Sequence, residues 1–184
     1  GLAKFGEILR QNNSNIEELS YTIIINLVKY MGANQGGFFM LREDEDKKKY
    51  FELTGCYAWD RKKFCNKRIE WAEGLIGACA LEKDIIYMTD VPDKYITITS
   101  GLGDANPRCI IIVPLIINDE VQGIIEMASF KVFEPFEMDF IRKLAESIAS
   151  TLYSVKSNLQ TRKLLEQSQH QAEELAQLQR YIAG

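Results

Sequence analysis

Two neighbouring apolar segments, residues 109–117 and 120–130, constrain the fold of this chain more strongly than any other feature. The first (CIIIVPLII) is apolar and mostly β-branched at odd and even positions alike, and the polar turn Asn118-Asp119-Glu120 leads into the second. This pattern predicts a β-hairpin. Because a strand that is apolar on both sides needs a cover on both sides, we expect a helical layer on one face of the sheet and a wall over a small-molecule cavity on the other.

The segment after this hairpin predicts one very long helix. Residues 134–182 contain no glycine, and their one proline, Pro135, stands where helices commonly begin. As a single helix, residues 135–182 would be about 72 Å long, whereas a domain of this size is roughly 35 Å across. The helix must therefore extend past the domain.

Apolar residues recur at helical spacing along this segment and suggest a partner for it. One stripe runs from Phe140 to Leu159, a polar break follows at Arg162-Lys163, and the pattern resumes from Leu165 to Ile182. A projecting apolar stripe needs a second helix, and the simplest one is its own copy. We expect a parallel homodimer through the C-terminal coiled-coil helix, from Phe140 to Leu178.

Composition limits the function classes. The 184 residues are 46% apolar and 26% charged, a soluble globular balance that allows one domain with a good core plus an extension. The net charge of −4 argues against non-specific nucleic-acid binding, which needs clustered cations. No apolar run approaches the ~20 residues that span a bilayer, and no secretory signal is visible. We expect neither nucleic acid nor membrane contact in this segment.

The four cysteines indicate neither a metal site nor a disulfide framework. Cys56, Cys65, Cys79 and Cys109 form no CxxC pair and have no metal-ligand spacing. Free cysteine packs as a small hydrophobic residue, and free thiols fit a reducing compartment. We expect a cytoplasmic protein.

The remaining patterns give the order of elements. Ser14 or Asn15 is expected to cap a helix that ends at Gly32. The long segment 90–108 is expected to be a loop with one helical turn at most, and loops of this length tend to be functional. The other expected elements are a helix over 4–11, strands over 37–42 and 49–59, a basic connector over 61–68, a helix over 71–82 and a strand over 85–89.

Three short motifs in this arrangement resemble the GAF domain family. They are residues 73–77 (EGLIG), 112–115 (IVPL) and 121–127 (VQGIIEM), in the order and spacing of that family. Phe133-Glu134 followed by Phe140-Ile141 is similar to the start of the family's last helix. The resemblance covers about residues 14–152.

This resemblance implies an α+β fold. Its antiparallel sheet has about six strands, with helices on one face, a loop-rich excursion on the other and a long C-terminal coiled-coil helix. It also implies a regulatory module, of the kind attached to histidine kinases of two-component systems, cyclases, phosphodiesterases or transcription activators. We place the sensory domain at residues 1–152 and the signalling helix at 153–184.

Several ligand classes known in the family fit poorly. Members that bind cyclic nucleotides carry an Asn-Lys-Phe-Asp-Glu signature, of which only Asn66-Lys67 is present. A bilin anchor needs a cysteine beside a histidine in the excursion, and haem needs an axial histidine. The single histidine, His170, lies in the last helix. The ligand or cofactor therefore stays unknown.

One enzymatic branch of the family, the free methionine-(R)-sulfoxide reductases, is also similar to part of this chain. Cys65, Arg68-Ile69 and residues 74–77 resemble its cysteine-bearing segment. Ile76, however, stands in the place of a second cysteine, and residues 95–108 lack the catalytic one. A thiol reductase needs an attacking thiolate and a resolving partner, so we do not expect an enzyme.

Strand alternation selects the ligand side of the sheet. Ile110, Ile112 and Pro114 share one face of their strand, and the resemblance implies that this face looks toward the ligand. Glu126 is unusual because it is a carboxylate among apolar residues. It either takes an edge or solvent-facing position, or accepts a hydrogen bond in a pocket from Arg108 or from a ligand.

The excursion offers further candidate contacts. Arg108 is either a surface cation or a fork for a ligand carboxylate or phosphate. The segment from Ser100 to Gly103 either forms a turn or presents N–H groups to an anion. The candidate apolar contacts are Trp59, Trp71, Ile76, Met88 and Tyr95. The site hypothesis is a small, partly apolar ligand; the alternative is a ligand-free dimerisation or spacer module.

Overall fold

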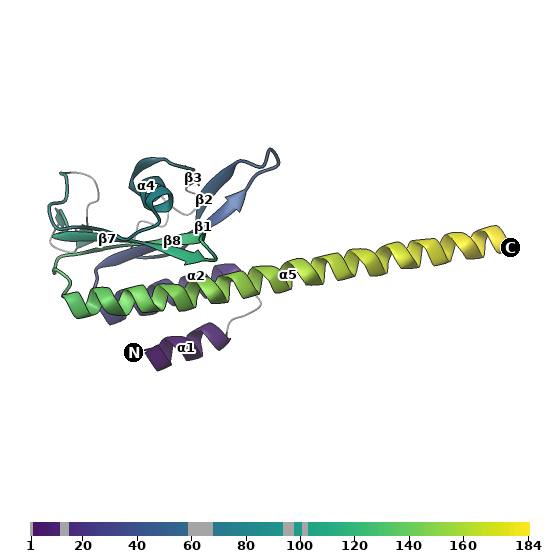
Figure 1. Cartoon of the computed structure of the whole chain (residues 1–184), viewed down its shortest axis with the longest axis horizontal. Helices are drawn as coiled ribbons and strands as arrows, with labels where there is room; N and C mark the ends of the chain where they lie inside the picture. Colours follow the sequence, from purple (N-terminus) through teal and green to yellow (C-terminus); the bar gives the residue numbers. More distant parts are fainter. Residues whose placement is uncertain (1, 12–14, 59–67, 94–97, 101–102) are drawn as a thin grey trace.

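A six-stranded antiparallel sheet forms the centre of the protein (Figure 1). The computed structural model describes residues 2–11, 15–58, 68–93, 98–100 and 103–184. In spatial order the strands are β3 (Arg68–Glu70), β2 (Lys49–Tyr57), β1 (Gln35–Glu43), β8 (Glu120–Ser129), β7 (Cys109–Ile117) and β4 (Ile86–Met88). The predicted α+β fold with an antiparallel sheet is confirmed.

The apolar hairpin is formed by β7 and β8 at the middle of this sheet. Ile112 pairs with Glu126, and Cys109 pairs with Ser129. The turn is made by Asn118 and Asp119, whose φ angles of 51° and 64° are left-handed. Asparagine and aspartate tolerate this conformation, which matches the twist of a two-residue hairpin.

Two helices, α2 (Ile16–Met31) and α5 (Pro135–Ala183), cover one face of the sheet, and α1 (Leu2–Gln11) packs against both of them on the side away from the sheet (Figure 1). The Asn15 side chain caps α2 by accepting hydrogen bonds from the Glu17 and Glu18 N–H groups at 2.9 and 3.2 Å, and Gly32 ends it with a left-handed φ. Cys109, Ile111, Val113 and Leu115 of β7 point into this helical core, as the alternation predicts.

Helix α4 (Gly74–Glu82) lies on the opposite face of the sheet (Figure 1). It packs over Ile110 and Ile112 of β7 in a second apolar cluster. Gly77 allows this helix to begin where it does, because a Cβ there would lie 2.2 Å from the carbonyl carbon of Ala72. Packing therefore requires glycine at the second glycine of the EGLIG motif, Gly77.

Three local predictions differ from the structure. The basic connector predicted over 61–68 runs into a short edge strand, β3, which a charge pattern does not predict. The helix expected to start at Trp71 starts at Gly74. The φ of 61° at Gly74 is left-handed, so residues 71–73 cannot form a helical turn that continues into α4. Within the segment predicted as a loop, β5 (Ile98–Ser100) and β6 (Gly103–Ala105) pair as a small antiparallel hairpin.

Helix α5 is one continuous helix of 49 residues whose C-terminal half extends far beyond the sheet (Figure 1). No described helix is long and apolar enough to cross a membrane. The buried residues of α5 end at Val155. Beyond it, large apolar side chains are exposed, and we call them the distal seam: Leu164, Leu165, Leu175, Leu178 and Ile182.

The expectation that the whole stripe from Phe140 faces a partner helix is wrong for its first half. Leu144, Ile148 and Leu152 are buried in the protein's own core against the sheet. The distal seam lies roughly 130° around the helix from Leu152. The break at Arg162-Lys163 therefore marks a change of face, from a stripe that packs on the domain to one that faces away from it.

Candidate functional site

The candidate site is the sheet face beneath α4. Ile110 and Ile112 of β7 are fully buried there, next to Ile76 of α4. Glu126 of β8 lies directly across the ladder from Ile112 and is only 3% exposed. Glu126 therefore places a buried carboxylate among the isoleucines of this sheet face.

Burial of Glu126 excludes one of the two sequence interpretations of this residue. Strand β8 lies between β1 and β7, so Glu126 occupies neither an edge nor a solvent-facing position. A buried carboxylate requires hydrogen bonds or compensating charge. Arg108, in contrast, is exposed and lies four residues before Ile112 along the chain, about 13 Å in an extended strand. Arg108 is therefore not its neighbour in the sheet.

Cys79 of α4 lies against the same face. Its thiol donates to the carbonyl oxygens of Asp84 at 3.3 Å and Ile112 at 3.7 Å. Burial, with smaller contributions from Asp84, Glu82 and Glu126, raises the pKa of the Cys79 thiol to about 12. The thiol stays protonated near neutral pH, so it is a packing group and not a nucleophile.

The remaining candidates are spread around this face. The Trp71 ring stacks on Phe51 of β2 with 5.8 Å between ring centroids, at the β3 end of the sheet. Met88 is half-buried on the edge strand β4, where it pairs with Ile110. Trp59, Tyr95 and Cys65 lie outside the described residues, as does the side chain of Ser100, the last residue of β5.

Sequence reasoning missed two parts of the site. The apolar helical pattern predicts Cys79 as a packed residue but not its contact with the sheet, although its spacing from Ile76 places both on one face of α4. Phe51 was not singled out, although it is fully buried against Trp71. No group of three or more His, Cys, Asp or Glu side chains in the described part of the chain is arranged to hold a metal ion.

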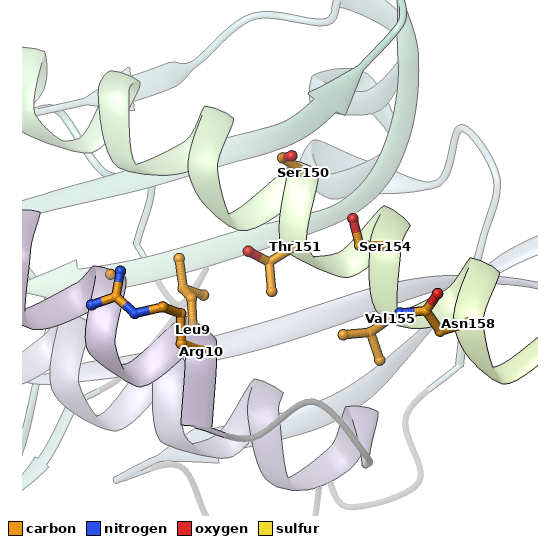
Figure 2. A pocket seen from close by; sticks show the side chains of 8 residues that line it. Leu9, Arg10, Ser150, Thr151, Ser154, Val155 and Asn158 are labelled. Carbon is orange, nitrogen blue, oxygen red and sulfur yellow. The ribbon is translucent and has the colours of Figure 1, made fainter.

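A hollow lies on the other side of the sheet, between α1 and α5. Its volume is about 350 Å³. Figure 2 shows Thr151 and Val155 of α5 and Leu9 of α1 pointing into the space between the two helices. We call this hollow the proximal groove and define it by Leu9, Arg10, Ser150, Thr151, Ser154 and Asn158.

Comparison with known proteins agrees with this geometry. The model of the GAF domain family matches residues 13–152. The chain is similar to the GAF domain of a phosphoenolpyruvate-protein phosphotransferase from Coxiella burnetii, with 21% identity and a TM-score of 0.65 over 83% of this chain and 94% of that one. No curated protein sequence matches the chain.

Two further solved structures show how widely the fold is used. One is a type II free methionine-R-sulfoxide reductase from Thermoplasma acidophilum, with 18% identity and a TM-score of 0.58 over 77% of this chain and 97% of that one. The other is the GAF-B domain of DevS from Mycobacterium smegmatis, with 12% identity and a TM-score of 0.59 over 77% and 96%. At these identities the likeness shows the fold alone.

Proposed function

The chain belongs to the GAF domain family, and on that premise we propose that it is a cytoplasmic sensory module. In this proposal it binds a small molecule beneath α4 and acts as a homodimer through α5. The helix then passes a signal to an output domain. The GAF family is one of signalling and ligand-binding modules, and its fold alone does not fix which of these tasks a member performs.

The observation that supports this proposal most strongly is the continuity of α5. Its first half packs on β7, the strand that also forms the floor of the candidate site on its other face. Its second half extends away from the domain with exposed leucines. A rigid helix that touches the sheet at one end and a partner at the other can transmit a shift of β7 over tens of ångströms.

Where α5 leaves the domain, a further contact ties it to the sheet. The Lys156 ammonium donates to the carbonyl oxygen of Leu41, near the end of β1, at 3.5 Å. Burial, together with the nearby Arg42, lowers the pKa of Lys156. The exit of α5 is thus held against β1, which is the strand beside β8 and Glu126.

The proposed ligand is small and partly apolar, with a hydrogen-bonding group at one end. Isoleucine side chains form the floor of the site, and α4 covers it from above. The Glu126 carboxylate is an acceptor, so a hydrogen-bond donor or a cation is the group expected at that point of the ligand. An anionic group would lie at the other end, near Arg108 and Ser100. The apolar contacts that the described residues offer at this point are Ile76, Ile110 and Ile112. Trp71 and Met88 lie toward opposite edges of the sheet, so a small ligand beneath α4 would not touch both.

Native mass spectrometry of the gently purified protein tests ligand binding. We expect a non-covalent mass increment on the wild-type chain, because a buried apolar floor with a carboxylate favours occupation. Glu126→Gln should reduce the occupied fraction at least about tenfold. Glu120→Gln, the same change at an exposed position of β8, should leave it unchanged. A wild-type protein without any increment would favour the alternative, a ligand-free spacer module.

The proposal also excludes reduction of free methionine-(R)-sulfoxide. Ile76 is buried in α4 at the position where the resemblance would place a second cysteine, and the nearby Cys79 is protonated. We expect no turnover in a thiol-coupled assay with this substrate. Turnover that disappears on Cys65→Ser would overturn this expectation.

A further inference from the structure

Residues of α5 that are spaced by seven run from the part of the helix packed on the domain to the distal seam. This series begins at Phe140 and continues along α5 with Ser147, Ser154, Thr161, Ser168, Leu175 and Ile182. Residues seven apart lie on one face of a helix that supercoils around a partner. The distal seam and the residues that precede it are therefore parts of one continuous face.

The start of this face is already covered within the protein. Phe140 meets the Phe5 ring of α1 edge-on at 6.2 Å and stacks on Tyr30 of α2 at 4.6 Å. Helix α1 ends at Gln11. The proximal groove opens beside its last turn, at Leu9 and Arg10. Helix α1 thus lies where a partner helix would otherwise lie at the start of this face, and the groove runs alongside the second half of α1, from Gly6 to Arg10.

Ser150, Thr151, Ser154 and Asn158 of the groove are in phase with the distal seam, whereas Val155, which also lines it, is buried in the domain's own core. Thr151 and Asn158 stand fourteen and seven residues before Leu165, and Ser150 stands fourteen residues before Leu164. Between Ser150 and Leu164 the charged residues are Lys156, Arg162 and Lys163, and they occupy other positions of the repeat than the distal seam. Among the described residues, Arg10 is the one charged residue that lines the groove.

Side-chain size in the groove suits a helix as its occupant. Serine and threonine are small, so they let a second helix approach to the 8–10 Å of close helix packing. A coiled coil also needs about three to four heptads to be sustained. Residues 164–182 provide fewer than three, whereas residues 150–182 provide more than four.

We infer that the proximal groove is the first part of an interface with a second copy of this chain, whose α5 lies parallel in the groove and along the distal seam. This inference rests on the proposed dimeric function and extends it, because it places the start of the two-helix contact at Ser150. The partner helices separate before this point to leave room for α1. The groove is then filled by the partner and is not a ligand pocket.

Disulfide trapping tests this placement. In a parallel dimer, equivalent residues of the seam face each other across the two-fold axis. Cysteines there meet the distance that a disulfide requires. Three variants are compared after mild oxidation: Ser154→Cys in the groove, Leu175→Cys in the distal seam and Gln160→Cys, exposed and off the seam. The wild-type chain provides the background from its native cysteines.

We expect Ser154→Cys and Leu175→Cys to yield similar fractions of cross-linked dimer, each at least about fivefold above Gln160→Cys. Cross-linking of Leu175→Cys without Ser154→Cys would overturn the inference while leaving the proposed dimer intact, and the groove would belong to another occupant. Absence of cross-linking in both variants would overturn the inference and the proposed parallel dimer together.

Discussion

Leu152→Glu is expected to abolish the cooperative thermal unfolding transition of the domain. Leu152 is completely buried between α5 and the sheet. Removing such a leucine costs about 2–5 kcal/mol, and burying a carboxylate there without a partner adds several more. Because a domain of this kind has a stability of only about 5–15 kcal/mol, little or no folded protein should remain at 25 °C.

The matched control for this variant is the neighbouring residue. Tyr153 is 45% exposed on the same turn of α5, so Tyr153→Glu should shift the midpoint of unfolding by only a few degrees. Circular dichroism during heating measures both variants. A Leu152→Glu protein that unfolds like the wild type would show that α5 does not dock on the sheet as described.

The double substitution Leu175→Glu and Leu178→Glu should have the opposite outcome, a folded domain that no longer dimerises. Leu175 is 60% exposed in the single chain, so the domain loses no core packing. In the proposed dimer, two carboxylates per helix would have to be desolvated at the seam. A loss of about 4 kcal/mol or more corresponds to a dissociation constant raised about a thousandfold.

Light scattering at tens of micromolar protein measures this effect. The wild type should have the mass of a dimer, and the double variant the mass of a monomer with an unchanged unfolding midpoint for the domain. His170→Glu with Gln177→Glu places two carboxylates on the opposite side of the same helix, and should remain dimeric. A monomeric wild type would refute the proposed dimer.

Both variants place carboxylates on apolar stripes of one helix, and the sequence does not distinguish the stripe that is buried from the one that is exposed. Helical periodicity identifies Leu152 and Leu175 equally well as members of an apolar stripe. The buried residues of α5 end at Val155, so the apolar stripe up to that residue packs in the domain's own core. Which residues remain for a partner depends on this end point, which is set by the tertiary fold.

Elements with local signals follow from the amino-acid sequence alone. The β7–β8 hairpin follows from its β-branched strands and its Asn118-Asp119 turn, and α2 follows from Asn15 and Gly32 at its ends. Alternation also assigned Ile110 and Ile112 to the face opposite Ile111 correctly. Each of these signals depends on neighbours within a few residues along the chain.

How those elements bury one another depends on the packing of the whole domain. It placed Glu126 on an inner strand with 3% exposure, whereas a strand pattern alone is equally compatible with an edge. It brought Cys79 of α4 against Ile112, thirty-three residues away, and added the short strands β3, β5 and β6. Burial is a sum over contacts between segments distant in sequence, so local spacing can say which face a side chain takes but not what lies against it.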